Sequence, residues 1–161
     1  MATNEESDEV LVGRYVRGDA AAFDQLYKRH ELRVWRYLER NVRSQATSDE
    51  LLQEVWSTLA RNAASLESAT RFRTRLFSLA YDRMSSALRA QPAAEAADST
   101  NSLAHAIGQL PREQREAYLL HIEGQLSVGE IAEITESAID STQNALRGAR
   151  LKLRELLSEP T

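Results

Sequence analysis

Hydrophobic side chains recur every three or four positions along most of this chain, which is the spacing of one face of an α-helix. The clearest run follows Gly18, which breaks a short preceding helix, and Asp19, whose carboxylate is suited to cap the next one. The inward face of that next helix is predicted to be Phe23, Leu26, Tyr27, His30, Val34, Tyr37, Leu38 and Asn41. The pattern therefore predicts a long amphipathic helix, preceded by a shorter helix that Asp8 caps.

Two more amphipathic helices are predicted in the first half of the chain. One begins at Ser48, and its inward residues are Leu51, Leu52, Val55, Trp56 and Leu59. Four polar side chains are left on its outer face, namely Asp49, Glu50, Gln53 and Glu54. The other runs from about Ala69 to Ala90, and its inward residues are Phe72, Leu76, Leu79, Ala80, Met84 and Leu88.

Residues 91–101 interrupt this periodicity. They contain Pro, Ala, Ser and acidic residues, but no aliphatic side chain larger than Ala, which is typical of a linker. The segment separates two independently patterned halves. We therefore expect an all-α fold of two small helical domains, residues 1–90 and 102–161, joined by a short linker.

The second half carries several helix boundary signals. A short helix through Ile107 is expected to end before Pro111, which is suited to the first position of the next helix. That helix should bury Tyr118, Leu119 and Ile122 and end near Gly124. Ser127 and Glu130 have the spacing of a capping box, which predicts a third helix. Ser137 is expected to cap the last one, with Thr142, Ala145, Leu146, Ala149, Leu153, Leu156 and Leu157 inward.

A short capped helix, a turn and a longer helix with basic residues make residues 127–157 a candidate helix-turn-helix. The outward face of the longer helix carries side chains that can pair with base edges: Ser141, Gln143, Asn144 and Arg147. Arg150, Lys152 and Arg154 can contact phosphates, which position such a helix without reading sequence. An ordinary helical hairpin with a polar outer face is the alternative interpretation.

The net charge of −4 at first argues against binding nucleic acid, but the charge is unevenly distributed. Residues 71–89 hold five arginines and one acid, and residues 147–154 hold four basic residues and no acid. The chain has no cysteine, which excludes disulfides and thiolate metal sites. No apolar run approaches the length that spans a bilayer, and the acidic start is unlike a signal peptide, so we expect a cytoplasmic protein without membrane insertion.

Several segments resemble extracytoplasmic-function (ECF) sigma factors of the sigma-70 family. L-P-R-E-Q-R-E-A-Y-L-L-H-I-E-G-Q-L-S-V-G-E-I-A-E-I, residues 110–134, and A-R-L-K-L-R-E-L-L, residues 149–157, are similar to region 4 of that family. In the first half, L-V-G-R-Y-V-R-G-D-A-A-A-F-D-Q-L-Y-K-R-H resembles the opening of region 2. D-E-L-L-Q-E-V-W resembles its polymerase-docking part, and F-R-T-R-L-F-S-L-A its promoter-melting part. The likeness covers nearly the whole chain in the expected order.

The resemblance implies a transcription initiation factor whose partners are core RNA polymerase (its β′ coiled coil and β flap) and promoter DNA, with an anti-sigma factor as a further possible partner. The residues implied to bind polymerase are Asp49, Glu50, Gln53 and Glu54. Those implied to contact the −10 element are Arg71, Arg73, Arg75 and Arg83, and the loop at about 66–70 matches a pocket for a flipped base. The residues implied to contact the −35 element are Ser141, Gln143, Asn144, Arg147, Arg150 and Lys152.

The chain also departs from the family pattern. Arg75 stands in place of a usual Trp, Asp82 in place of a frequent Asn, and Gln143, Ala145 and Gly148 in place of basic residues. These departures leave a second hypothesis open, a sigma mimic that sequesters an anti-sigma factor without driving transcription. A plain helix-turn-helix regulator is a third. We do not expect an enzyme, a cofactor or a metal site, because the three histidines are far apart in sequence and no phosphate-loop or nucleophile motif occurs.

Overall fold

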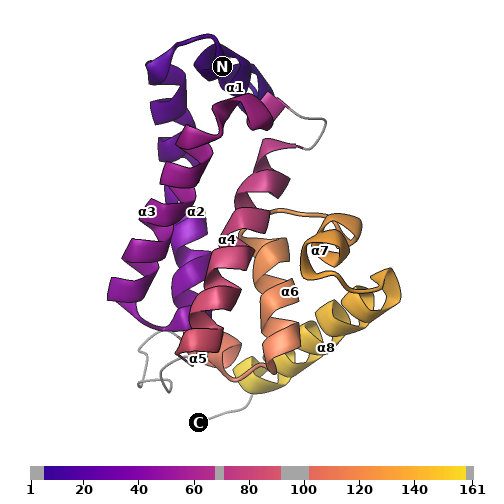
Figure 1. Cartoon of the computed structure of the whole chain (residues 1–161). Helices are drawn as coiled ribbons and strands as arrows, with labels where there is room; N and C mark the ends of the chain where they lie inside the picture. The colour runs from indigo at the N-terminus through magenta and orange to yellow at the C-terminus, as the bar shows by residue number, and fades with distance from the viewer. Residues whose placement is uncertain (1–5, 68–70, 92–101, 159–161) are drawn as a thin grey trace, which may run out of the picture.

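The computed structural model describes residues 6–67, 71–91 and 102–158, and this part of the chain is helical without a strand. The elements in chain order are α1 (Asp8–Val16), α2 (Ala20–Val42), α3 (Gln45–Arg61), the 3₁₀-helix η1 (Ala63–Glu67), α4 (Phe72–Ala90), α5 (Ser102–Gly108), α6 (Arg112–Ile122), α7 (Val128–Thr135) and α8 (Ile139–Ser158). Figure 1 shows α1–α4 as an elongated bundle, with α5–α8 packed against it. The predicted all-α class with two helical groups is confirmed.

Local signals explain where the helices of the first group begin. The Asp19 carboxylate accepts a hydrogen bond from the Ala21 N–H, as predicted for the cap of α2. The predicted cap of α1 is wrong, because Ser7 caps that helix. The predicted start of α3 at Ser48 is also wrong. The hydroxyl of Ser44 accepts from the Thr47 N–H and starts α3 earlier, which leaves Ser48 fully buried inside the helix.

The core of the first group is rich in aromatic rings. The ring of Trp56 packs against those of Phe23, Tyr27 and Phe72, with centroids 5.1–6.4 Å apart. Tyr37 and Phe77, both fully buried, meet edge to face at 5.7 Å. Such geometry adds to the stabilisation that comes from burial alone. The core fixes α3 and α4 with one face inward, which determines the side chains that remain outside.

His30 is buried in this core, as its position on the inward face predicts. Its Nε2 lies 3.0 Å from the carboxylate of Asp8, which also accepts a hydrogen bond from Arg29 at 2.8 Å. Burial alone would raise the pKa of Asp8, but the hydrogen bonds and charges of His30 and Arg29 outweigh that effect and lower it. Asp8 therefore ties α1 to α2 instead of capping α1.

In the second group the predicted capping box is present: the Ser127 hydroxyl accepts from the Glu130 N–H, and the Glu130 carboxylate accepts from the Ser127 N–H. Other details differ from the prediction. Pro111 is the N-cap of α6 and not its first residue. Ser137 does not cap α8, because its hydroxyl hydrogen-bonds to Thr135. Ile122 and Leu157, predicted inward, are about half exposed.

The two helical groups are in direct contact, through α2 with α5 and α6 and through α4 with α7. Tyr37 of α2 is fully buried, which raises the pKa of its hydroxyl well above the usual value, and the nearby carboxylate of Glu116 on α6 adds to the shift. The guanidinium of Arg43, which ends α2 in a left-handed conformation, donates to the carbonyl of Gly108 at the end of α5. The predicted linker lies outside the described residues except for Gln91.

Candidate nucleic-acid and protein interfaces

An acidic face on α3 is formed by the four polar residues that the periodicity leaves outside: Asp49, Glu50, Gln53 and Glu54. All four are exposed, while Leu51, Val55 and Leu59 on the other side of the helix are buried. The Asp49 carboxylate accepts a hydrogen bond of 2.9 Å from the indole N–H of Trp35 on α2. The acidic face is therefore supported by the bundle, and one of its carboxylates already has a protein partner.

Arg83 of α4 lies beside this acidic face. It lines a shallow groove of about 610 Å³ together with Glu50, Gln53, Glu54 and Arg61. Arg83 is grouped by sequence with the arginines at the start of α4, but the structure does not bring it to them. Its charge instead lies next to the carboxylates of α3.

The other three arginines of this group lie at the start of α4, with Arg71 as its N-cap, and each has a protein acceptor. Arg71 lies 3.4 Å from the Glu130 carboxylate of α7. Arg73 donates to the side-chain oxygen of Gln125 at 3.0 Å. Arg75 donates to the carbonyl of Ser65 in η1 at 2.8 Å. These guanidinium groups are therefore not free in this structure.

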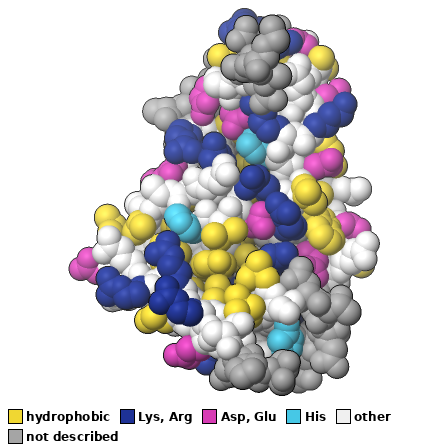
Figure 2. Space-filling model, turned by 180° about the vertical axis from the view of Figure 1, so that it is seen from behind, with side chains coloured by type: hydrophobic (Ala, Val, Ile, Leu, Met, Phe, Trp, Pro, Cys, Tyr) yellow, Lys and Arg dark blue, Asp and Glu magenta, His cyan; other side chains and the backbone are white. Residues whose placement is uncertain are grey.

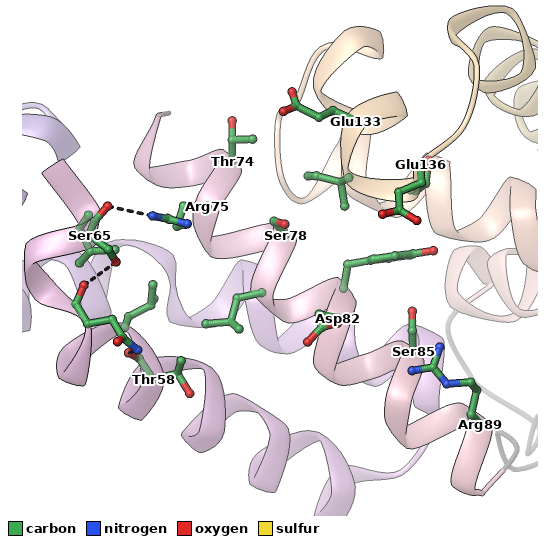
Figure 3. A pocket seen from close by; sticks show the side chains of 17 residues that line it. Thr58, Ser65, Thr74, Arg75, Ser78, Asp82, Ser85, Arg89, Glu133 and Glu136 are labelled. Carbon is green, nitrogen blue, oxygen red and sulfur yellow. Dashed lines mark hydrogen bonds between the residues drawn. The ribbon is translucent and has the colours of Figure 1, made fainter. Parts of the chain in front are cut away.

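A groove of about 790 Å³ runs along α4 between α3, η1 and α7. Figure 3 shows α4, with Ser78 and Asp82, between Thr58 of α3 on one side and Glu133 and Glu136, at the end of α7, on the other. Leu66, in the loop region that resembles the flipped-base pocket, is buried, and residues 68–70 of that loop lie outside the described residues. The groove combines basic and acidic side chains, with the acids contributed mainly by α7.

A basic face on α8 is formed by Gln143, Arg147, Arg150 and Arg154. These four residues line a shallow groove of about 460 Å³ with Val128 of α7. In Figure 2, Lys and Arg side chains gather at the lower left, beside hydrophobic ones. Asn144, Ser141 and Lys152 are exposed as well, but Ser141 lines a different groove with Tyr81 and Arg112. The six residues predicted for the −35 element are thus all exposed, but they do not form one surface.

His121 of α6 lies beside this basic face. Its isolated position in the sequence did not predict this contact. Its Nδ1 lies 3.1 Å from the carbonyl oxygen of Leu126 and can only donate there. In the neutral ring, Nε2 is then the acceptor, and it lies 3.4 Å from the Arg150 guanidinium. The contact spans 29 residues, so only the fold could reveal it.

Two of the departures in α8 have a packing explanation. Ala145 and Gly148 are half-buried, so side chains at these positions do not lie on the outward face with Arg147. A Cβ added to Gly148 would lie 2.6 Å from the side-chain nitrogen of Gln114 on α6. The absence of basic residues here therefore removes less of the exposed positive charge than the sequence alone indicates.

The part of the chain that the structure describes contains no group of three or more His, Cys, Asp or Glu residues that could hold a metal ion. Within the same ranges, no helix is both long and apolar enough to cross a bilayer.

Family comparisons agree with the order of these elements. The models of Sigma-70 region 2 and of Sigma-70, region 4 match residues 26–93 and 100–153. The RNA polymerase sigma factor CarQ of Myxococcus xanthus is 33% identical over 168 residues, which cover 91% of this chain and 95% of CarQ. The ECF RNA polymerase sigma factor SigM of Mycobacterium tuberculosis is 28% identical, over 96% of this chain and 86% of SigM.

Solved structures show the same fold. The structure of CnrH in complex with the cytosolic domain of CnrY matches with a TM-score of 0.76 and 21% identity, over 97% of this chain and 100% of that one. The sigma factor RpoE in complex with the anti-sigma factor NepR from Bartonella quintana gives 0.72 and 19%, over 86% and 98%. From its family matches and its relatives, this chain belongs to the sigma-70 family as an ECF RNA polymerase sigma factor, a transcription initiation factor.

Proposed function

We propose that this sigma factor binds core RNA polymerase through the acidic face of α3 and directs it to promoters through contacts with the −10 and −35 elements. In this proposal residues 1–90 dock on polymerase and act at the −10 element, residues 91–101 are the linker, and residues 102–161 act at the −35 element. The observation that carries it is the placement of the four acidic-face residues together and exposed, on a helix whose other side is buried.

The partner of the acidic face is a basic coiled coil of the β′ subunit. Opposite charges across such an interface steer the encounter and fix its register. Glu50 and Glu54 lie one helical turn apart, so both carboxylates can face the same partner helix. Asp49 accepts from Trp35, so it also orients the indole ring at the edge of the face.

At the −10 element, Arg71, Arg73 and Arg75 are the phosphate contacts that we propose, since they lie together at the N-cap and in the first turn of α4. We assign Arg83 a weaker role in that contact, because it lies beside Glu50 and Glu54. The side of this groove that α3, η1 and α4 form is the proposed path for the melted strand, and the flipped base is expected near Leu66. Extracting a base costs a few kcal/mol of stacking, which these contacts must offset.

At the −35 element, Gln143, Asn144 and Arg147 are the proposed base contacts, because amide and guanidinium groups can pair with adenine and guanine in the major groove. Arg150 and Lys152 then contact phosphates, with Arg154 and Ser141 at the edges. The β flap of polymerase is expected to bind the same domain. Ile122 of α6 and Leu151 of α8 are 43% and 54% exposed and are candidates for that apolar contact.

A sigma mimic that captures an anti-sigma factor is the second candidate function. One observation favours it: Asp82, Glu133 and Glu136 give the groove along α4 negative charge, which repels phosphate. An anti-sigma partner is compatible with both functions. Run-off transcription with purified core polymerase separates them, because only a working sigma factor yields promoter-specific transcripts.

The variant Glu50→Lys/Glu54→Lys tests the proposed docking face. It places positive charges opposite a basic partner, so affinity for core polymerase should fall by roughly a hundredfold, the size of effect that losing close charge pairs produces. Affinity is measured by pull-down or fluorescence anisotropy with core enzyme. Asp24→Lys/Glu113→Lys is the control, since it changes the net charge equally at exposed positions off this face. Equal affinity of both variants would refute the docking assignment.

A further inference from the structure

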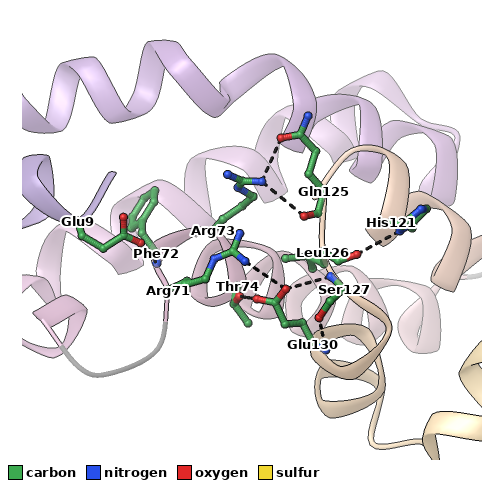
Figure 4. A network of polar contacts seen from close by, with 10 residues as sticks. All are labelled: Glu9, Arg71, Phe72, Arg73, Thr74, His121, Gln125, Leu126, Ser127 and Glu130. Carbon is green, nitrogen blue, oxygen red and sulfur yellow. Dashed lines mark hydrogen bonds and ion pairs between the residues drawn. The ribbon is translucent and has the colours of Figure 1, made fainter. Parts of the chain in front are cut away.

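The start of α4 is bound by the protein's own second domain. Thr74 donates its hydroxyl hydrogen to Glu130 of α7, and the Arg71 guanidinium lies 3.4 Å from the same carboxylate. Figure 4 shows Glu130 between these two residues and Ser127, with Arg73 reaching Gln125 next to them. The residues in contact are more than fifty positions apart in sequence, so they join the two domains.

Glu130 has two tasks in this arrangement. One of its oxygens accepts from the Ser127 N–H and completes the capping box of α7, while the other accepts from Thr74. Burial opposes ionisation of Glu130, but the hydrogen bonds from Ser127 and Thr74 and the charge of Arg71 outweigh it, so its pKa lies below the usual range. The carboxylate is therefore charged and well satisfied when the domains are together.

Among the described residues, three further polar contacts between the domains have the same direction: the first domain donates and the second accepts. Arg36 of α2 lies 3.2 Å from Glu123, whose side chain is only 5% exposed. Arg43 donates to the carbonyl of Gly108, and Arg73 to Gln125. These donor–acceptor pairs at several separate points hold one relative orientation of the domains. A shift of one domain against the other would leave buried acceptors such as Glu123 without a hydrogen-bond partner.

These contacts occupy groups that the −10 element would need. Arg71 and Arg73 are the proposed phosphate contacts, and in the closed arrangement they bind Glu130 and Gln125 instead. One wall of the groove along α4 is formed by the end of α7, and this wall carries Glu133 and Glu136 (Figure 3). A DNA strand that entered along α4 would meet these carboxylates, so closure and −10 binding exclude each other.

We propose that Glu130, with Thr74 and Arg71, forms an interdomain latch that holds the free sigma factor closed and covers its −10 surface until the domains separate. The inference rests on the proposed −10 role of α4. Since only the open form binds the −10 strand, the apparent affinity of the free protein for that strand falls by the fraction of open molecules. The latch thus keeps the free protein from promoters without any inhibitory partner.

Closure is measured by energy transfer between dyes on the two domains. The chain has no cysteine, so Gln25→Cys on α2 and Glu155→Cys on α8, both exposed, give two unique labelling sites. The latch variant is Glu130→Gln/Gln125→Gly. Gln at position 130 can still complete a capping box, and Gly suits the left-handed backbone at position 125 (φ 53°). The latch variant should lower energy transfer and bind a single-stranded −10 oligonucleotide roughly three to five times more tightly.

Glu113→Gln is the matched control, because it removes a carboxylate from the first turn of α6 in the same domain. It should leave both readouts unchanged. If the latch variant loses its helical signal and is therefore unfolded, Thr74→Val replaces it. This substitution removes the hydrogen bond to Glu130 from the α4 side and leaves the capping box intact. Energy transfer in the Thr74→Val protein then decides whether the latch exists. Unchanged energy transfer in folded latch variants overturns the latch. Lower transfer with unchanged oligonucleotide binding supports the latch and refutes the proposed −10 role of α4.

Discussion

The two helices proposed to bind DNA differ in how their polar side chains are engaged. On α8, Gln143, Asn144 and Arg147 are exposed and make no side-chain hydrogen bond or ion pair within the described part of the chain. On α4, Arg71, Arg73 and Arg75 each have a protein acceptor. The comparison teaches that polar side chains proposed to contact DNA can present a ready surface in one domain and an occupied one in the other.

Asp8→Asn tests the contacts that support the start of α4 and has the largest expected effect. The backbone N–H of Phe72 at the start of α4 lies 3.4 Å from Glu9 of α1, and the ring of Phe72 packs on His30, the partner of Asp8. Because Asn carries no charge, it cannot make charge-assisted hydrogen bonds with both His30 and Arg29. The free energy of unfolding should therefore fall by about 2 kcal/mol at pH 7. Urea unfolding measures it.

The pH dependence follows from the lowered pKa of Asp8. A carboxylate with a depressed folded pKa stabilises the fold above its unfolded value of about 3.9, and this contribution is lost as the pH falls through the folded pKa. The difference between wild type and Asp8→Asn should therefore be full at pH 7 and shrink below about pH 4. Asp24→Asn, exposed on α2, is the control and should show no such difference. A gap between wild type and Asp8→Asn that is as large at pH 3 as at pH 7 would contradict the assignment.

Arg147→Ala tests the free surface of α8. If Arg147 reads a base, the substitution should weaken binding to a −35 duplex by roughly tenfold. It should leave the thermal midpoint unchanged, because no protein partner among the described residues is lost. Lys152→Ala, on the opposite flank of the same helix, should cost less and weaken binding equally on all sequences. If Arg147→Ala leaves transcription from the best promoter unaffected, the register proposed for α8 is wrong.

Arg75→Ala is the counterpart on α4 and has the smallest expected effect. It removes the hydrogen bond to the Ser65 carbonyl, so stability should fall by about 1 kcal/mol or less. The same substitution at position 147 serves as the reference, since it should cost no stability. Chemical unfolding of the two variants side by side makes the measurement. Equal stability of both would remove the distinction between an engaged and a free arginine.

Local patterns predicted much of the fold. The inward faces of α2 and α4, the cap at Asp19 and the capping box at Ser127 depend on residues within one or two turns, which a single sequence displays. The start of α3 was mispredicted because two serines, at positions 44 and 48, precede the same hydrophobic run. In the structure α2 ends in the left-handed turn at Arg43, so Ser44 directly after it caps α3, and the hydrophobic pattern does not reveal that turn.

The exposed faces of α3 and α8 were predictable for the same reason, since a helix that buries one side must present the other. The contacts of the arginines on α4 were not. Glu130 is 59 residues from Arg71, and the sequence reveals it only as a capping residue. The position of Arg83 beside Glu50 likewise depends on how α3 and α4 pack. Charge runs thus predicted which residues are basic, but not which of them are available.

The double use of Glu130 limits how this protein can evolve. The capping box of α7 favours Glu or Gln at this position, whatever happens elsewhere in the chain, because the first turn of α7 depends on that side chain. A descendant that needed to respond faster would therefore change Thr74 or Arg71, because neither side chain makes a capping hydrogen bond. Natural variation in how easily such proteins open should accumulate on the α4 side and leave the α7 side constant.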